Sequence, residues 1–202
     1  MTTPATPATT PADRPQRADA RRNRARILDA ARVVLAELGV EAGMDEIARR
    51  ADVGVGTLYR HFPTKDALVE AIAADHFAEL AELAGRALEA DGTPGERFTG
   101  FMWSAAMRTR ADAAMAQVMA EHPQVLDRVA GTKSALVERV AELVRAAVAS
   151  GELRPDATGD DVGAIMCGLG SVVASERVRG GADGERYLTI ALDGLRHRGP
   201  DA

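Results

Sequence analysis

The chain has little of several residue types, and each shortage narrows its possible functions. Its 202 residues include one cysteine, Cys167, so no disulfide can form within the chain, and the sequence suits a reducing cytoplasm. Aromatic residues make up 3% of the chain, which predicts a core built mainly from alanine, leucine and valine. No apolar run approaches the roughly 18 residues of a membrane span.

The sequence also lacks the motifs of an enzyme. The four histidines, His61, His76, His122 and His197, are scattered, and none has a cysteine or carboxylate partner at metal-ligand spacing. There is no phosphate-binding glycine loop and no nucleophile elbow. We therefore expect no catalytic residue, no metal and no cofactor.

Helical patterns cover most of the chain, and no strand pattern occurs. Apolar residues recur at helical spacing, and glycine, proline or Asx residues close most segments. Outside the segment 44–68, the predicted helices are 21–38, 65–90, 94–108, 111–120, 125–149, 160–179 and 184–197. Residues 1–13 are threonine, proline and alanine repeats without the apolar region of a signal peptide, so we expect a disordered arm. The sequence predicts an all-α protein.

The segment from Met44 to Leu68 carries the strongest functional pattern. It predicts two short helices joined by a turn at 52–54 and a third helix capped by Thr64. One turn residue needs a positive φ, which Asp52 tolerates better than most residues. The second helix is too short and too polar to be core throughout. This is the helix-turn-helix layout, in which the second helix enters the DNA major groove.

Charge is distributed as a DNA-binding protein requires. The segment from Arg14 to Lys65 holds eleven basic and seven acidic side chains, net +4, whereas the whole chain carries −5. Six arginines, including Arg21 and Arg22, lie between residues 14 and 26. A solvated charge run is the alternative, but beside a helix-turn-helix these arginines indicate phosphate or minor-groove contact.

Residues 21–68 resemble the DNA-binding domain of the TetR/AcrR family of bacterial transcription regulators. The resemblance rests on the run Gly56-Thr-Leu-Tyr-Arg-His-Phe-Pro-Thr-Lys-Asp-Ala-Leu68 and covers about a quarter of the chain. The sequence departs from the family at Gly43-Met44, where a phosphate-touching threonine is frequent, and at Asp52 and Gly54, where glycine and serine are usual. The first departure removes one phosphate contact, and the others change only the chemistry of the turn.

The resemblance implies three regions: an arm at 1–20, the helix-turn-helix domain at 21–68, and a helical effector-binding and dimerisation domain at 69–198. In the first helical domain Arg60 is the expected base reader, because its guanidinium can pair with two acceptors on guanine. Val55 and Gly56 begin the recognition helix and lie nearest the bases. We expect Thr57 and Tyr59 on phosphate or a thymine methyl, and His61 and Lys65 on phosphate.

The resemblance also places a small-molecule pocket and a dimer interface in the larger domain. The candidate pocket residues are Phe77, Phe98, Met102, Trp103, Met107, Met119, His122, Met166 and Cys167. For any single one of them a place in the core is the more common alternative, and Trp103 and His122 are the better pocket candidates because a buried indole N–H or imidazole needs a partner. Small residues run through helix 160–179, where each interior glycine costs about 0.5–1 kcal/mol relative to alanine unless a neighbouring helix approaches closely. That neighbour is either within the chain or in a second subunit. The candidate interface residues are Gly163, Gly168, Gly170, Ala174, Leu188, Leu192 and Leu195.

Three functions remain open from the sequence. The best supported is a cytoplasmic, homodimeric repressor that leaves a palindromic operator when an effector binds. The others are a small-molecule-binding module whose DNA-binding domain has lost its function, and a helical enzyme without a recognisable motif. The sequence identifies neither the effector nor the operator.

Overall fold

The computed structural model describes residues 13–39, 41–112, 114–115, 118, 124–179 and 183–196, and within these ranges the protein is helical. The prediction of an all-α protein is confirmed. An isolated antiparallel bridge between Leu153 and Arg196 is the sole β pairing in the described part. The helices are α1 (Asp13–Leu38), α2 (Met44–Arg50), α3 (Val55–His61), α4 (Lys65–Glu89), α5 (Pro94–Ala111), α7 (Val125–Arg128), α8 (Ala130–Ala149), α9 (Gly159–Arg179) and α10 (Gly184–Leu195).

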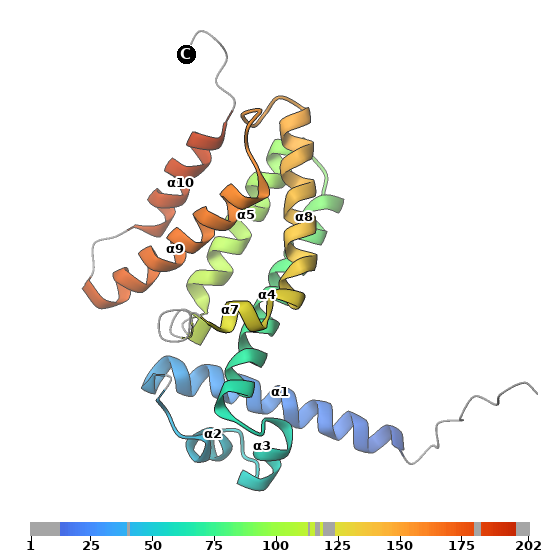
Figure 1. Ribbon diagram of the computed structural model, residues 1–202, viewed down its shortest axis with the longest axis vertical. Coiled ribbons are helices and arrows are strands. Elements are labelled where there is room, and N and C mark those ends of the chain that lie inside the picture. Colours follow the sequence, from blue (N-terminus) through green and yellow to red (C-terminus); the bar gives the residue numbers. More distant parts are fainter. Residues whose placement is uncertain are drawn as a thin grey trace, which may run out of the picture.

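The helices form a lower and an upper body joined by one long helix (Figure 1). In the lower body α1 lies across the short helices α2 and α3. Helix α4 begins beside α3 and rises into the upper body, where it packs most extensively against α8 and then against α5. Helices α9 and α10 pair with each other and lie against α5 on the outer side of this body.

Local sequence explains where several helices begin and end. The Thr64 side chain accepts a hydrogen bond from Ala67 N at 3.0 Å and caps α4, as predicted. Thr93 and Glu96 form a reciprocal capping box that starts α5. Gly39 closes α1 at φ 80°, a left-handed conformation that costs glycine little.

Three predicted helix boundaries were wrong. Helix α1 begins at Asp13 rather than at residue 21, so its first two turns lie in the segment expected to be a disordered arm. Helix α5 continues to Ala111, where Asp112 ends it. The single helix predicted for 125–149 is divided at Val129 into α7 and α8. The predicted helix 111–120 lies largely outside the described residues.

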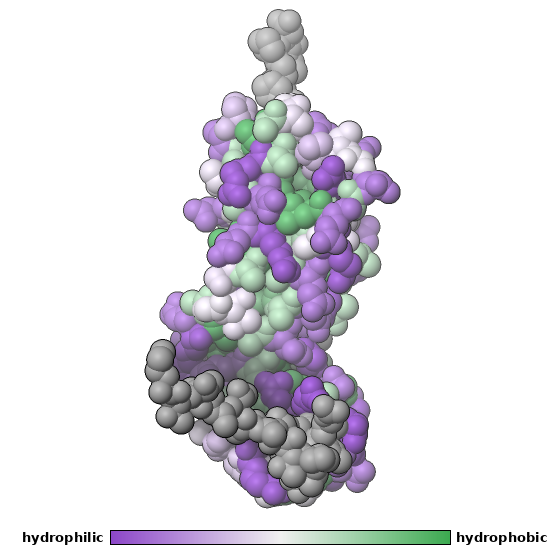
Figure 2. Space-filling view, turned by 90° about the vertical axis from the view of Figure 1, so that its right-hand side faces the viewer, coloured by the Kyte–Doolittle hydropathy of each residue, from purple (hydrophilic) through white to green (hydrophobic). Residues whose placement is uncertain are grey.

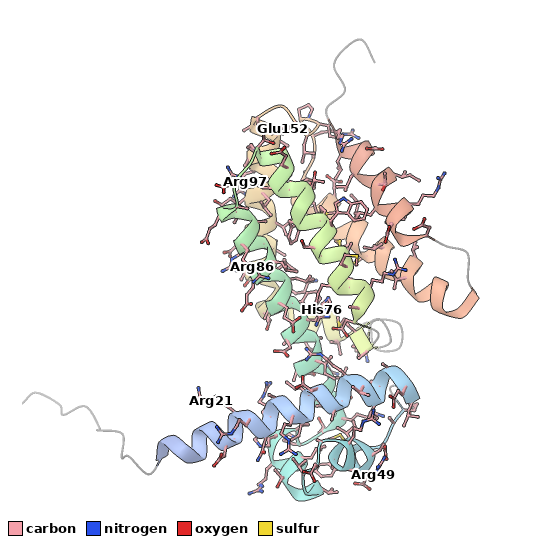
Figure 3. The ribbon with its side chains drawn as sticks, turned by 180° about the vertical axis from the view of Figure 1, so that it is seen from behind. Arg21, Arg49, His76, Arg86, Arg97 and Glu152 are labelled. Atoms are coloured by element: carbon pink, nitrogen blue, oxygen red, sulfur yellow. The ribbon has the colours of Figure 1, made fainter. Side chains whose placement is uncertain are left out.

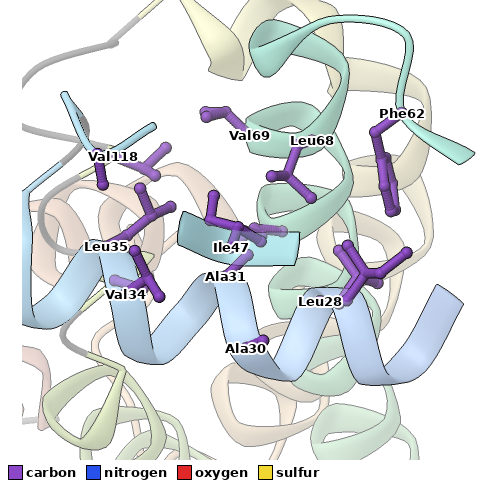
Figure 4. Close-up of a cluster of buried hydrophobic side chains, with 14 of the residues drawn as sticks. Leu28, Ala30, Ala31, Val34, Leu35, Ile47, Phe62, Leu68, Val69 and Val118 are labelled. Atoms are coloured by element: carbon purple, nitrogen blue, oxygen red, sulfur yellow. The ribbon is translucent and has the colours of Figure 1, made fainter. Parts of the chain in front are cut away.

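Two clusters of buried side chains hold the bodies together. The lower cluster joins α1, α2, α3 and the start of α4, with Ile27, Ile47, Leu58 and Leu68 fully buried (Figure 4). Burying one such side chain contributes about 1.5–3 kcal/mol. Val118, which follows α5, also belongs to this cluster and packs against the helices of the lower body.

The upper cluster lies among α4, α5, α8, α9 and α10. Its largest fully buried side chains are Phe98, Met102, Leu143, Leu169 and Leu188. The face in Figure 2 is mainly polar, with apolar atoms exposed in a limited strip of the upper body. No helix within the described ranges is both long enough and apolar enough to cross a membrane.

Candidate DNA-binding surface and effector cavity

Helix α3 presents the predicted recognition residues at the surface of the lower body. Leu58 is fully buried and anchors the helix, while Val55 and Tyr59 are 42% and 44% exposed. Gly56 and Arg60 are also exposed. Because Leu58 alone anchors this seven-residue helix, the opposite side of α3 is free to contact another molecule.

The turn before α3 has the backbone conformation that the sequence predicted. Asp52 has φ 51°, the sole positive value for a non-glycine residue in the described ranges. Arg26 of α1 donates from Nη2 to the Asp52 carbonyl oxygen and to its Oδ2, each at 3.1 Å. These bonds tie α1 to the turn. Sequence reasoning assigned Arg26 to a DNA-facing cluster and missed this structural role.

The predicted DNA-contacting cations belong to α1, α3 and the start of α4, and they differ in their present partners. Arg60 donates from Nη2 to Thr57 Oγ1 at 2.9 Å, so its guanidinium lies along α3. Arg22 pairs with Asp19 on α1, and Arg21 is exposed on the same helix (Figure 3). His61 and Lys65 are half-buried at the end of α3 and the start of α4.

The start of α2 confirms the departure noted in the sequence. Gly43 is the N-cap residue, and no side chain caps the helix there. The acidic residues Asp45 and Glu46 occupy the first turn instead, where the helix dipole favours negative charge. This helix end is therefore stabilised without a side chain that would also touch phosphate.

A cavity of about 520 Å³ lies in the upper body among α4, α5, α8 and α9. This volume is in the range of pockets that hold organic ligands. The lining is mainly apolar. It consists of His76, Phe77, Leu80, Phe101, Ala105, Thr109, Met115, Lys133, Leu136, Val137, Val140, Gly159, Asp160, Val162, Gly163, Met166, Cys167, Gly170, Ser171 and Val173.

The predicted pocket residues separate into four groups. Phe77, Met166 and Cys167 line the cavity. Phe98 and Met102 do not: both are fully buried in the upper cluster and are core residues. Trp103 and Met107 border a separate, much smaller hollow between α5 and α10. Met119 and His122 lie outside the described residues.

A buried polar pair stands at the lower end of the cavity. His76 of α4 is 4% exposed and Asp112, directly after α5, is 5% exposed. His76 Nδ1 lies 3.2 Å from Asp112 Oδ2, while Asp112 Oδ1 accepts a hydrogen bond from Met115 N at 2.9 Å. Arg108 Nη1 lies 3.2 Å from the same carboxylate. Figure 3 shows His76 at the base of the upper body.

The pKa of Asp112 reflects this setting. Burial alone would raise the pKa, but hydrogen bonds from His76 and Met115 N, with the charges of His76 and Arg108, lower it to about 2. The carboxylate is therefore ionised at neutral pH and can only accept hydrogen bonds, so His76 Nδ1–H is the donor. In the described part of the chain, no three metal-ligating side chains gather as an ion site.

The ion pairs continue from this pair to the lower body. Arg108 also pairs with Glu79 of α4. Arg32 of α1 lies 2.9 Å from Asp75 and 3.8 Å from Glu79, both on α4. The run Arg32–Glu79–Arg108–Asp112 thus connects α1 with the wall of the cavity through side chains of α4 and α5.

The small residues of α9 have several different surroundings. A β-carbon on Gly168 would clash with Tyr187 Oη of α10, so this glycine allows close approach within the chain. Gly163 and Gly170 line the cavity and would have no such clash. The side chain of Ala174 lies outside the described residues.

The predicted interface leucines lie inside the chain. Leu188, Leu192 and Leu195 of α10 are 0%, 5% and 8% exposed and belong to the upper cluster. They pack against helices of their own chain and expose little surface to a second subunit. The exposed side of α10 instead carries Ile190, which is 60% exposed.

The fold, the exposed helix α3 and the cavity of the upper body define a class of protein. The chain belongs to the TetR family of bacterial regulatory proteins. The N-terminal family model, "Bacterial regulatory proteins, tetR family", matches residues 27–72. A second model, "Transcriptional regulator SbtR-like, C-terminal domain", matches residues 93–197, more than half of the chain. The family is one of transcriptional regulators and not of enzymes.

Individual relatives agree with the family. The HTH-type transcriptional repressor KstR of Mycobacterium tuberculosis is 31% identical over 138 residues, covering 67% of this chain and 63% of that protein. The match to KstR of Mycolicibacterium smegmatis covers 38% of each chain. The chain thus spans less than two thirds of the length of these KstR relatives.

Two further relatives are matched over more of their length. The regulator UidR of Escherichia coli is 32% identical over 149 residues, covering 68% of this chain and 72% of that protein. The crystal structure of a TetR regulatory protein from Mycobacterium vanbaalenii is 36% identical with a TM-score of 0.65, covering 90% of this chain and 99% of that one.

Proposed function

We propose that this protein is a homodimeric, cytoplasmic repressor that binds a palindromic operator and is released when a small molecule enters the 520 Å³ cavity. One observation carries the proposal. Helix α4 is continuous from Lys65 to Glu89, and it contributes to both the lower body and the wall of the cavity. Its first turns belong to the lower cluster, and its middle turns line the cavity.

The continuity of α4 supplies a physical route between the two sites. Leu68 and Ile72 are fully buried against the DNA-binding helices. Phe77 and Leu80, one to two turns later, line the cavity. A helix packed on both sides moves as a rod, so a ligand that displaces Phe77 also displaces α3. The coupling free energy of such linked sites is typically about 1–3 kcal/mol, or 5–150-fold in affinity.

The DNA contacts are assigned from exposure and chemistry. The Arg60 guanidinium gives up its hydrogen bond to Thr57 and donates to the acceptors of a guanine instead. Val55 and Gly56 lie against base edges. Tyr59, Thr57, His61 and Lys65 contact phosphate or a thymine methyl, and Arg21 and Arg22 reach the flanking backbone. Repression is the expected outcome of operator occupancy, because the KstR relatives are transcriptional repressors.

Dimerisation follows from the geometry of operators. A single helix-turn-helix reads one half-site, and two half-sites lie about 34–36 Å apart on one face of DNA. A two-fold dimer presents both recognition helices at that spacing. We assign the dimer contact to the exposed sides of α9 and α10, which carry Ala164, Ile190 and Gly194, because the leucines of α10 are committed to the core.

A DNA-binding experiment tests the proposal. The full chain is titrated into a fluorescent DNA fragment from the region upstream of its own gene, at fixed salt, with a scrambled fragment of equal length as control. We expect the upstream fragment to bind at least about 10³-fold more tightly than the scrambled one. Sedimentation of the complex should give two chains per operator.

The alternative functions give different results in the same experiment. A binding module with a silent DNA-binding domain would show no preference between the two fragments, yet would still bind small molecules. Equal affinity for upstream and scrambled DNA, in a protein that remains folded, would therefore refute the repressor. A monomer on the operator would refute the two-fold arrangement alone.

A further inference from the structure

The cavity contains one cation without an ion-pair partner among the described residues. Lys133 of α8 lines the cavity, and its Nζ lies 5.3 Å from the centre of the Phe77 ring. The neighbouring arginines differ from it, because Arg32, Arg108 and Arg128 all pair with carboxylates. Lys133 is also one of only two lysines among 25 basic residues. The Lys133 ammonium is thus held by an aromatic ring and not by a carboxylate, and its N–H donors can bind an anion in the cavity.

The position of Lys133 on its helix strengthens this reading. It lies in the first turn of α8, where the helix dipole disfavours a cation and favours an anion. A negative group bound at Lys133 would therefore be stabilised by both the ammonium and the helix end. His76 lines the same end of the cavity, but its Nδ1 is already committed to Asp112.

The acidic group in the lining lies at the other end. Asp160 is in the first turn of α9, next to Gly159, whose β-carbon position would be 3.5 Å from Ala141 of α8. Ala141 follows Lys133 by eight residues, or about 12 Å along the helix. The cavity thus has a positive end at Lys133 and a negative end at Asp160, with apolar side chains between them.

The apolar part of the lining determines which kind of body a ligand must carry beside its charged head group. Leu80, Phe101, Leu136, Val140 and Met166 belong to the same lining as the two charged groups. A flexible methionine and branched aliphatic side chains favour a hydrocarbon body over a polar one. A ligand that satisfies both regions has one negative head and an apolar body.

We propose that the cavity binds an apolar monocarboxylic acid, with its carboxylate on Lys133 Nζ and its hydrocarbon body along Leu80, Leu136 and Met166. The inference rests on the proposed function only in taking this cavity as the effector site. Asp160 adds a selectivity: an acid with a second carboxylate at its far end is rejected, because that group would meet a like charge. Lys133 is therefore the residue that selects the head group.

Calorimetry with three matched probes tests the inference on the full chain. The probes are decanoate, 1-decanol and decanedioate, which share a ten-carbon chain and differ in charge. We expect decanoate to bind at least about tenfold more tightly than decanol, as one charge-assisted pair supplies. Decanedioate should bind more weakly than decanoate.

Two lysine variants give matched controls. Lys133→Met should reduce decanoate affinity by about tenfold, to that of decanol, while leaving decanol affinity unchanged, which also shows that the variant is folded. Lys133→Arg should retain the preference for decanoate. Arg145→Met, at an exposed cation of the same helix outside the cavity lining, should change neither.

The outcomes separate this inference from the proposed function. Three results would overturn the ligand class. The wild-type chain could bind decanoate and decanol equally, it could bind neither, or its preference for decanoate could survive Lys133→Met. Operator binding is measured independently of these titrations. If decanoate binds through Lys133 but operator affinity is unchanged in its presence, the ligand class stands and the repressor mechanism fails.

Discussion

His76 Nδ1 donates to Asp112 Oδ2 across 3.2 Å, and this buried bond joins the middle of α4 to the residue that ends α5. Asp112 also accepts from Met115 N, so it holds the start of the segment that packs against the DNA-binding helices. The same carboxylate thus contacts the cavity wall through His76 and the lower cluster through Met115. A change at either place must alter the geometry of the other.

Replacing Asp112 should reveal this bond as a pH-dependent contribution to stability. The pKa of Asp112 is about 2, below its ordinary value of 3.8, so the ionised form stabilises the fold by about 2 kcal/mol at neutral pH. That contribution is complete above about pH 4 and is lost as the pH falls through about 2. In urea unfolding, Asp112→Asn should lower the free energy of unfolding by about 2 kcal/mol at pH 7, and the difference from wild type should shrink between pH 4 and 2.

The surface pair of Arg154 and Asp156 provides the control for this measurement. Asp156 accepts two hydrogen bonds from Arg154 but is exposed to solvent. Asp156→Asn should leave the free energy of unfolding nearly unchanged, because a solvent-exposed ion pair contributes little to stability. A pH-independent loss in Asp112→Asn would mean that the carboxylate acts through packing and not through its charge.

The ion pairs of Arg32 should carry part of the coupling between ligand and DNA. Arg32 joins α1 to Asp75 and Glu79 of α4, and its side chain is 20% exposed. Arg32→Ala should reduce the effect of decanoate on operator affinity by about 0.5–2 kcal/mol, measured as the ratio of operator affinities without and with ligand. Arg50→Ala, which breaks the exposed pair with Glu37 inside the lower body, should leave that ratio unchanged.

Arg60 and Lys65 should differ in what they do for DNA binding. Arg60→Ala should cost about 1–3 kcal/mol on the operator and relax the preference at one base position, because a bidentate guanine contact is lost. Lys65→Ala should weaken all sequences alike and reduce the slope of log affinity against log salt by about one. Equal losses on operator and scrambled DNA for Arg60→Ala would show that it contacts only the backbone.

The sequence predicted local features well because each depends on neighbouring residues. The cap at Thr64, the closure of α1 at Gly39 and the positive φ at Asp52 all follow from residues within a few positions. Helix faces were equally clear from periodicity. The division at Val129 was missed because apolar spacing continues through it, and the break depends on packing against distant helices.

The cavity could not be read from the sequence to the same degree. Phe77 and Phe98 are both apolar residues on helix faces, yet one lines the cavity and the other fills the core. Which one faces empty space depends on how α4, α5, α8 and α9 cross. Lys133 was missed for the same reason, since it meets Phe77 across 56 positions of sequence, although its rarity as a lysine was visible.

Asp52 should tolerate glycine better than alanine. At φ 51° a β-carbon costs about 1–2 kcal/mol, and the aspartate offsets part of this cost through its bond to Arg26. Asp52→Ala retains the strain and loses the bond, so it should lower the free energy of unfolding by about 1 kcal/mol. Asp52→Gly loses the bond but relieves the strain and should lie within about 0.5 kcal/mol of wild type. Thermal unfolding of the two variants side by side measures the difference.

The glycines of α9 distinguish contacts within the chain from contacts with a second subunit. Gly168→Ala brings a β-carbon against the Tyr187 side chain of α10, which must move, so this variant should be less stable than the alanine variants of the other two glycines. Gly163→Ala and Gly170→Ala meet no atom of their own described chain within 4 Å, and alanine is the better helix former by about 0.5–1 kcal/mol. Both should therefore raise the free energy of unfolding. If a second subunit approaches α9 at the exposed Gly163, the alanine there should stabilise the isolated chain but raise the dimer dissociation constant. Both Gly163→Ala and Gly170→Ala should weaken decanoate binding, because both glycines line the cavity, whereas only Gly170→Ala should leave dimerisation unchanged. Sedimentation equilibrium and calorimetry on the two variants separate these effects. A Gly163→Ala chain that dimerises as wild type does would place the subunit contact elsewhere, on the outer side of α10 around Ile190.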